Sequence, residues 1–166
     1  MIEFERLSKV TQYREDFIEL FRQLENYLDQ FIIFKSEDQR TVLVNWIVHT
    51  HLIHLFSATP YLHIYSAELR CGKTLLMNLL HQLSRKSIST INITEAIFRY
   101  INEAEPTLII DEVDRFFGEE KFAIEGILNA GFIRYGGGVL RTVGNAHEPE
   151  EFEVFCPKVF SGIGKS

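Results

Sequence analysis

A run of glycine, lysine and threonine in the middle of the chain could bind a phosphate group. In the pattern of a phosphate-binding loop, a glycine and four further residues precede Gly-Lys-Ser/Thr. The chain departs from this pattern only at the first glycine, and it reads Ala67-Glu68-Leu69-Arg70-Cys71-Gly72-Lys73-Thr74. The alternative is a strand–turn–helix connection in which Gly-Lys-Thr occurs by chance.

The chemistry of such a loop explains its residue types. Successive backbone N–H groups turn toward the phosphate oxygens, and the helix that follows adds partial positive charge at its first turn. Gly72 leaves room for the phosphates, Lys73 is a candidate catalytic residue at the β- and γ-phosphates, and the Thr74 hydroxyl suits Mg²⁺. The sequence therefore predicts a site for ATP and Mg²⁺ with the nucleotide-binding residues Glu68, Leu69, Arg70, Cys71, Gly72, Lys73, Thr74 and Leu75.

Two acids at the end of an apolar strand form a second motif. Residues 108–110 read Leu-Ile-Ile, and Asp111 and Glu112 follow them. Ligands of parallel α/β sheets bind at the carboxyl ends of the strands, so we expect these acids to lie near the phosphate loop. Asp111 is then a second candidate ligand of Mg²⁺, and Glu112 is a candidate general base for the attacking water. An acidic turn that pairs with Arg115 is the alternative.

Helices and strands alternate around the two motifs. Helical spacing of apolar residues is found in residues 13–34, 37–56, 73–84, 94–102 and 122–130. Strands are expected near residues 61–65, 87–93, 107–111 and 158–161. This order predicts an α/β fold of the three-layer P-loop type with a mostly parallel central sheet. It divides the chain into an N-terminal helical segment, residues 1–58, packed on a core of residues 59–166.

A glycine run predicts a β-hairpin inserted into this alternation. Residues 132–142 surround Gly136-Gly137-Gly138, which is typical of a tight turn between two strands. Arg134 and Arg141 flank the turn and are candidate contacts for single-stranded or forked DNA. The stretch that follows is acidic and would repel DNA, so two solvated hairpin arginines are the alternative.

The composition limits the classes of protein to consider. Hydrophobic residues make up 46% of the chain and charged residues 24%, as in an ordinary globular protein. A net charge of −6 argues against a broad electrostatic grip on DNA or on a membrane. The apolar stretch 41–58 is too short and too polar for a bilayer, and no signal-peptide pattern opens the chain, so we expect a cytoplasmic protein. A guanine-reading Asn-Lys-x-Asp motif is missing, which favours ATP.

Several further motifs resemble, in their residues and in their order along the chain, those of a known family. They are residues 46–53, 60–62, 70–74, 106–114, 128–131 and 157–164. Over residues 40–166 the chain resembles a poorly characterised family of AAA+-like P-loop ATPases from phage, plasmid and mobile-element primase–helicase proteins of bacteria. The resemblance implies a bacterial or phage-encoded ATPase of the helicase type, which acts on DNA during mobile-element replication and assembles as a homo-oligomeric ring.

The resemblance also implies roles for single residues. Gly72-Lys73-Thr74 matches the Walker A motif, Asp111-Glu112 matches Walker B, and Ser161 takes the place of a sensor for the γ-phosphate or the attacking water. Members of the family continue beyond the equivalent of Gly164 to an arginine, whereas this chain ends at Ser166. We therefore expect a core in which nucleotide binding survives better than turnover. A nucleotide-dependent interaction module and a small-molecule phosphotransferase are the alternatives.

Overall fold

The computed structural model describes residues 2–66, 72–90, 94–113, 119–143 and 148–163. The chain forms two compact units, Met1–Asn45 and Trp46–Ser166. The division falls before Trp46 and not after residue 58, where the sequence suggested it. At this boundary the indole N–H of Trp46 donates a hydrogen bond of 3.0 Å to the carbonyl of Pro60. This contact ties Trp46 to the segment that leads into the sheet.

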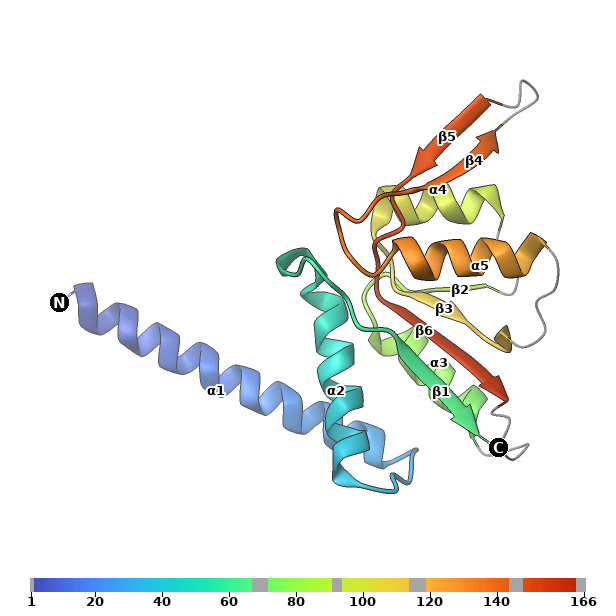
Figure 1. Ribbon diagram of the computed structural model, residues 1–166. Helices are drawn as coiled ribbons and strands as arrows, with labels where there is room; N and C mark the ends of the chain where they lie inside the picture. Colours follow the sequence, from blue (N-terminus) through green and yellow to red (C-terminus); the bar gives the residue numbers. More distant parts are fainter. Residues whose placement is uncertain (1, 67–71, 91–93, 114–118, 144–147, 164–166) are drawn as a thin grey trace. The chain divides into compact units, whose positions relative to one another are not determined.

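The first unit consists of helix α1 and the beginning of helix α2 (Figure 1). Their bounds are Ile2–Asp29 for α1 and Glu37–His51 for α2, and a 3-10 helix, η1, follows at Ile53–Leu55. The guanidinium of Arg40, on α2, binds the carboxylate of Asp29 at 2.8 Å and links the two helices. Helix α1 begins much earlier than the predicted start at residue 13.

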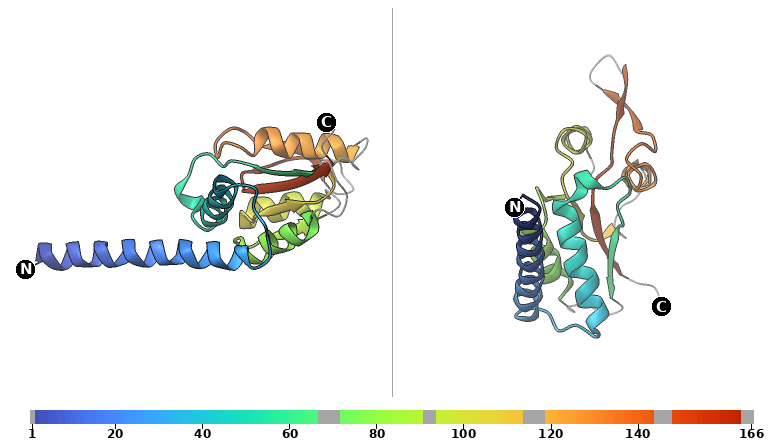
Figure 2. Two further views of the ribbon diagram at one scale, coloured as in Figure 1. Left: turned by 90° about the horizontal axis from the view of Figure 1, so that it is seen from below. Right: turned by 90° about the vertical axis from the view of Figure 1, so that its left-hand side faces the viewer.

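The second unit is built on a four-stranded sheet with the order β1-β6-β3-β2, and every neighbouring pair of strands is parallel. The strands are β1 (Leu62–Ser66), β2 (Ile88–Thr90), β3 (Leu108–Ile110) and β6 (Lys158–Ile163). The helices are α3 (Lys73–Leu83), α4 (Glu95–Ala104) and α5 (Glu119–Ala130). Helices α3 and α5 lie on opposite sides of the sheet (Figure 2). The expected α/β architecture with a parallel central sheet is therefore confirmed.

Strand β6 comes last in the chain but lies between β1 and β3. Its register sets Ser66 of β1 against Ile163, and Ile110 of β3 against Phe160. Since the three strands run in one direction, their carboxyl ends gather at one edge of the sheet. Asp111 and Glu112, which directly follow β3, therefore lie at the edge where β1 and β6 also end.

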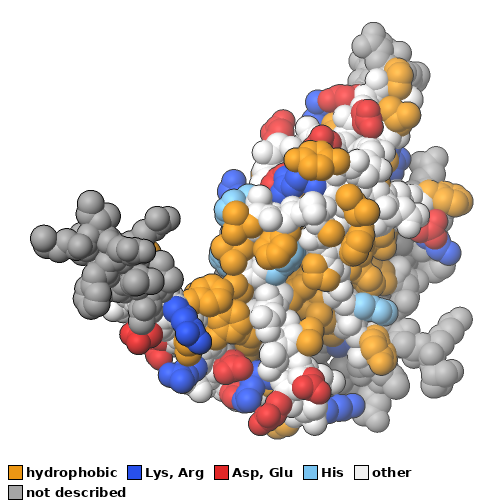
Figure 3. Space-filling view, turned by 60° about the vertical axis from the view of Figure 1, so that its left-hand side comes forward, with side chains coloured by type: hydrophobic (Ala, Val, Ile, Leu, Met, Phe, Trp, Pro, Cys, Tyr) orange, Lys and Arg blue, Asp and Glu red, His pale blue; other side chains and the backbone are white. Residues whose placement is uncertain are grey.

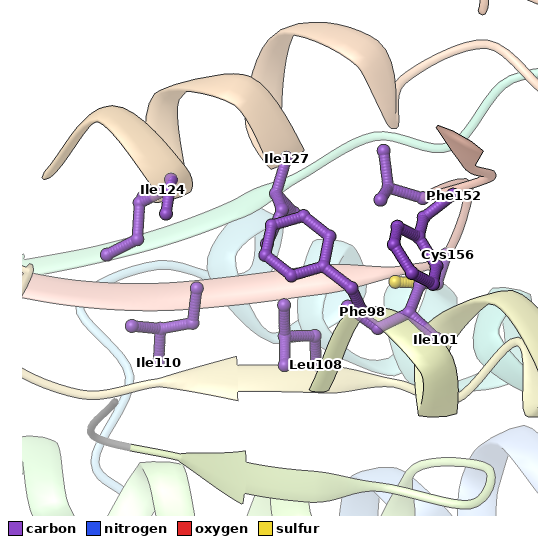
Figure 4. Packing of buried hydrophobic residues seen from close by; sticks show 10 residues of the cluster. Phe98, Ile101, Leu108, Ile110, Ile124, Ile127, Phe152 and Cys156 are labelled. Carbon is purple, nitrogen blue, oxygen red and sulfur yellow. The ribbon is translucent and has the colours of Figure 1, made fainter. Parts of the chain in front are cut away.

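The main core of the second unit lies between the sheet and helices α4 and α5 (Figure 4). Leu108 and Ile110 belong to this cluster together with Phe98 of α4 and Ile127 of α5, and each is at most 1% exposed. Complete burial of an aliphatic or aromatic side chain of this size stabilises a fold by roughly 1.5–3 kcal/mol. Because alternate residues of β3 are buried in this core, the position of the strand end is fixed, and with it the position of Asp111, which follows the strand.

The β-hairpin is present, but not where the glycine run predicted it. Strands β4 (Val139–Val143) and β5 (Glu148–Phe152) pair in antiparallel fashion with Val143 opposite Glu148, so residues 136–138 precede the hairpin and do not form its turn. Gly138 has a steric role instead, because a Cβ atom there would lie 2.6 Å from the Cγ atom of Glu151. The glycine thus allows the two strands to approach at the base of the hairpin.

The segment before the hairpin pairs with a different part of the chain. The backbone N–H of Thr59 donates to the carbonyl of Phe132 at 3.0 Å, and the N–H of Arg134 donates to the carbonyl of Ser57 at 2.9 Å. These bonds hold residues 132–134 beside the segment that precedes β1. Pairing of this kind joins positions far apart in the chain, which explains why local turn chemistry misplaced the hairpin.

Candidate functional site

Gly72 forms the N-cap of helix α3 in a left-handed conformation. Its φ is +86°, and within the described part of the chain no side-chain hydrogen bond caps this helix start. Among the described residues, nothing lies within 4 Å of the place that a Cβ atom would take here, and a φ of this sign favours glycine. The first backbone N–H groups of a helix can in general bind an anion. The predicted nucleotide-binding residues Glu68, Leu69, Arg70 and Cys71 lie outside the described residues.

Lys73 opens helix α3 and reaches the end of strand β6. Its half-buried ammonium donates a hydrogen bond of 3.0 Å to the carbonyl of Gly162, which lies 89 residues further along the chain. Thr74 and Leu75 follow in the first turn of α3, and both side chains are exposed. The lysine is therefore placed at the carboxyl edge of the sheet, with the two next predicted residues facing solvent.

Asp111 and Glu112 lie at the same edge and are held by Ser161. The Ser161 side chain is fully buried, and its hydroxyl donates a hydrogen bond to the carboxylate of Asp111. The same oxygen accepts a hydrogen bond of 3.2 Å from the backbone N–H of Glu112. Glu112 has a φ of +57°, a conformation that residues other than glycine seldom adopt. The hydroxyl thus fixes both the carboxylate and the unusual backbone that follows it.

Two consecutive residues of β6 connect the predicted motifs. Ser161 binds the acidic pair, and the carbonyl of the next residue, Gly162, binds the ammonium of Lys73. One strand end thus gathers a cation, a carboxylate and the start of a helix. This combination can bind a phosphate through positive charge and backbone donors, and a divalent cation through carboxylate oxygen.

A metal site made of protein ligands alone is not found in the described part of the chain. There, no group of three or more His, Cys, Asp or Glu side chains is arranged to hold a metal ion. Magnesium that accompanies a nucleotide needs only one or two carboxylates, because phosphate oxygens and water complete its coordination. Asp111, which is half-buried at this edge, offers one such carboxylate.

Arg134, a candidate DNA contact, is bound within the chain. Its guanidinium forms an ion pair with Glu105 and donates to the carbonyls of Ile53 and Phe56 at 3.1 and 3.3 Å. It also lies over the ring of Phe155, 4.4 Å from the centroid. Only 17% of the side chain is exposed. This placement favours a packing role, and it fits neither a DNA contact nor the solvated hairpin arginine considered as the alternative.

Arg141 lies on β4 and faces helix α4. Its guanidinium is 4.7 Å from the centroid of the Phe98 ring, and the strand register sets it opposite Glu150. Among the described residues, the opposite face of the hairpin presents Leu140, Thr142 and other side chains without positive charge. On the side that Figure 3 shows, basic and acidic side chains are interspersed. The described hairpin therefore offers no cluster of cations to a nucleic acid.

Lys158 is a buried cation that the sequence did not single out for a role. It begins β6, at the end opposite the candidate site, and its side chain is fully buried. The ammonium donates to the carbonyls of Val154, Cys156 and Gly131 at 2.8, 3.0 and 3.3 Å. Burial lowers the pKa of Lys158. The sequence signal that could have drawn attention to Lys158 is its position directly before an apolar strand. Its contacts with three backbone carbonyls indicate a structural role.

No protein-family model matches the chain, and the search of curated proteins found no match. None of the helices in the described residues combines the length and the apolar character that crossing a membrane requires.

Proposed function

We propose that the chain binds ATP together with Mg²⁺ at the carboxyl edge of the parallel sheet. The observation that carries this proposal is the pair Ser161–Gly162, which binds Asp111 through one residue and Lys73 through the next. In this proposal the lysine leaves the Gly162 carbonyl for the β- and γ-phosphates. The first N–H groups of α3 bind phosphate oxygens, and Thr74 and Asp111 complete the coordination of Mg²⁺.

Hydrolysis of ATP is the reaction that this arrangement supports best. Glu112 follows the metal-binding acid directly and would orient and deprotonate the attacking water. Lys73 and Mg²⁺ would neutralise charge on the transferred phosphoryl group. By its resemblance to AAA+-like P-loop ATPases of mobile-element primase–helicases, the chain would couple this reaction to DNA in a homo-oligomeric ring.

A second candidate is a module that binds nucleotide without turnover and presents a nucleotide-dependent surface. The placement of Arg134 and Arg141 favours it, because Arg134 binds Glu105 and Arg141 faces Phe98. Neither guanidinium is directed to an outside phosphate. The support for coupling between nucleotide binding and DNA binding is therefore weaker than the sequence implied.

Calorimetric titration with Mg-ATP tests the binding proposal. We expect saturable binding by the unaltered chain and at least a tenfold loss, roughly, for Lys73→Met, since the ammonium–phosphate contact disappears. Lys86→Met is the matched control, because Lys86 is exposed and precedes β2 at the opposite edge of the sheet. A folded chain that gives no heat with Mg-ATP, or equal losses for both variants, would refute the proposal.

Phosphate release separates the two candidate functions. Turnover that single-stranded DNA accelerates supports the helicase-type ATPase, whereas binding without turnover supports the interaction module. Turnover that requires an added acceptor molecule would instead identify a phosphotransferase. Glu112→Gln is the informative variant here, because it should abolish turnover and leave Mg-ATP binding intact.

A further inference from the structure

Three aromatic rings form a row on one face of strands β1 and β6. The ring of His63 stacks on the ring of Phe160, with centroids 4.8 Å apart and planes inclined by 29°. The His63 ring also contacts the ring of Tyr65, with centroids 5.7 Å apart. Phe160 packs against the main core of the second unit, whereas 69% of Tyr65 is exposed. The row therefore begins at the core and ends in a ring that is largely open to solvent.

Tyr65 lies beside the candidate phosphate site. In the pairing of β1 with β6 it stands opposite Gly162, and the carbonyl of Gly162 accepts the hydrogen bond from the ammonium of Lys73. The two strands run side by side and end at the same edge of the sheet (Figure 1). Residues that stand opposite each other direct their side chains to the same face, and neighbouring strands are about 4.8 Å apart. Because Gly162 has no side chain, it leaves the ring of Tyr65 uncovered next to the lysine.

An exposed aromatic ring beside a phosphate site suits the base of a nucleotide. Every base has a flat π-face, and stacking of a base on an aromatic side chain contributes to binding. Stacked or tilted rings prefer centroids about 4.5–7 Å apart, and the contact of Tyr65 with His63 already falls in this range. Because His63 contacts the ring before any ligand binds, less side-chain freedom is lost on binding. A base on Tyr65 would continue the row outward.

Leu75 is a second apolar side chain near the site, and it is 44% exposed. It belongs to the first turn of α3, which lies on the side of the sheet opposite to α5 (Figure 2). Tyr65 instead shares a face with His63 and Phe160, and Phe160 packs against the cluster that includes α5 residues. The two side chains thus offer a base two different positions. Of these, only Tyr65 presents a flat ring on which a base can stack.

We propose that the ring of Tyr65 stacks on the base of the nucleotide whose phosphates bind at Lys73. This inference rests on the proposed function, because it takes the phosphate site at the carboxyl edge of the sheet as given. It assigns to Tyr65 the positioning of the base, which the residues of the phosphate loop and the acidic pair do not provide. The ligand at Tyr65 is an aromatic base, because the exposed ring ends a row of aromatic rings and lies one strand away from the group that holds Lys73.

Calorimetric titration with two ligands tests this contact. Inorganic triphosphate, supplied with Mg²⁺, carries the phosphates of ATP without the base. We expect Tyr65→Ala to weaken the binding of Mg-ATP about tenfold and to leave the binding of Mg-triphosphate unchanged, while Tyr65→Phe keeps both the ring and the affinity. Tyr135→Ala is the matched control, because Tyr135 is 85% exposed and follows residues that pair with the segment before β1, at the other end of that strand.

The outcomes separate this inference from the proposed function. A chain that binds neither ligand refutes the proposed function. If the chain binds both ligands and Tyr65→Ala changes neither affinity, only the role of Tyr65 is overturned. Equal losses for both ligands in Tyr65→Ala would also overturn it, because the effect would then not involve the base. A loss of Mg-ATP affinity in Leu75→Ala and not in Tyr65→Ala would place the base on the other side of the sheet.

Fluorescence of a Tyr65→Trp variant gives a direct signal, and this variant keeps an aromatic ring at the position. The sequence has a single tryptophan, Trp46, which is 4% exposed, so the unaltered chain provides the background emission. We expect Mg-ATP to quench the emission of the introduced indole, because the base stacks on it, and Mg-triphosphate to leave this emission unchanged. The same response to both ligands would mean that the base does not contact this ring, and it would overturn the inference even if Tyr65→Ala did not fold.

Discussion

The hydroxyl of Ser161 donates a hydrogen bond to the carboxylate of Asp111, which precedes it by 50 residues. The serine is fully buried on β6, and the aspartate directly follows the neighbouring strand β3. The same hydroxyl also accepts the backbone N–H of Glu112, so it holds both the Asp111 carboxylate and the backbone that follows it. The orientation of the proposed magnesium ligand is thus set by a residue that touches neither phosphate nor metal in our proposal.

Replacing Ser161 by alanine should weaken the response to Mg²⁺. We expect the Mg²⁺ concentration for half-maximal ATP binding to rise about tenfold, because a hydrogen bond to a charged group contributes roughly 1.5–3 kcal/mol. The measurement is a calorimetric titration with ATP at a series of Mg²⁺ concentrations. Ser89→Ala is the control, since Ser89 is an exposed serine on β2 of the same sheet. Equal Mg²⁺ dependence in both variants would show that Ser161 has no positioning role.

Gly131 should tolerate no side chain. A Cβ atom there would lie 2.3 Å from the ammonium of Lys158 and 2.4 Å from the carbonyl oxygen of Val154. Either the helix end or the buried lysine must move, and a displaced cation loses carbonyl partners inside the core. We therefore expect Gly131→Ala to lower the free energy of unfolding by about 3 kcal/mol or more, measured by urea denaturation.

Gly126 offers a matched control on the same helix. A Cβ atom at this position would meet only the methyl groups of Val139, at 3.7 Å, which is ordinary contact. Alanine favours a helix interior over glycine by roughly 0.5–1 kcal/mol, so Gly126→Ala should stabilise the fold slightly. Similar losses in both variants would mean that the ammonium of Lys158 is not the obstacle.

Much of the fold can be predicted from local sequence. The apolar run of β3 and the periodicity of α3 and α5 are local signals, and the structure has these elements close to their expected bounds. Strand order is harder to predict, because β6 is last in the chain yet central in the sheet. The hairpin was misplaced for a related reason. Gly138 is required by the approach of Glu151, a contact that no local pattern contains.

The sequence indicated which residues form the candidate site, but it did not indicate which partners they bind. Lys73 and Asp111 were chosen because phosphate and magnesium need an ammonium and a carboxylate at the carboxyl edge of a sheet. The carbonyl of Gly162, which binds Lys73, carries no signal in its side chain. The ion pair of Arg134 could not be predicted either, since an arginine near a hairpin has the same sequence signal whether it faces solvent or binds Glu105.

Arg134 should therefore matter for stability. Arg134→Gln removes the ion pair to Glu105 and the guanidinium donors to the carbonyls of Ile53 and Phe56, of which the Ile53 carbonyl still accepts the backbone N–H of Phe56. We expect the free energy of unfolding to fall by about 2–4 kcal/mol in urea denaturation, because a largely enclosed carboxylate also loses its partner. The exposed ion pair of Arg99 and Glu150 is the comparison, and Arg99→Gln should cost less than about 1 kcal/mol. A stable Arg134→Gln variant with reduced affinity for DNA would instead restore the nucleic-acid role.

His49 should make the fold sensitive to mild acid. One ring nitrogen lies 3.0 Å from the hydroxyl of Thr59, and the ring packs against Phe56 with centroids 4.5 Å apart. Burial lowers the pKa of His49 below its ordinary value of 6.5. The unfolded chain then binds a proton more readily than the folded chain. The free energy of unfolding should therefore fall as pH drops from 6.5 toward the lowered pKa, and this group should cause no change above 6.5.

A variant that cannot titrate isolates this contribution from the other histidines. His49→Gln keeps a polar group within reach of Thr59 but binds no proton between about pH 5 and about pH 8. Urea denaturation of both proteins at these two pH values gives the change in stability for each. We expect the unaltered chain to lose more stability in acid than the variant, because only its folded state excludes a proton at this position. If both proteins lose the same amount, the neutral ring of His49 does not stabilise the fold, and its enclosure by Phe56 is incidental.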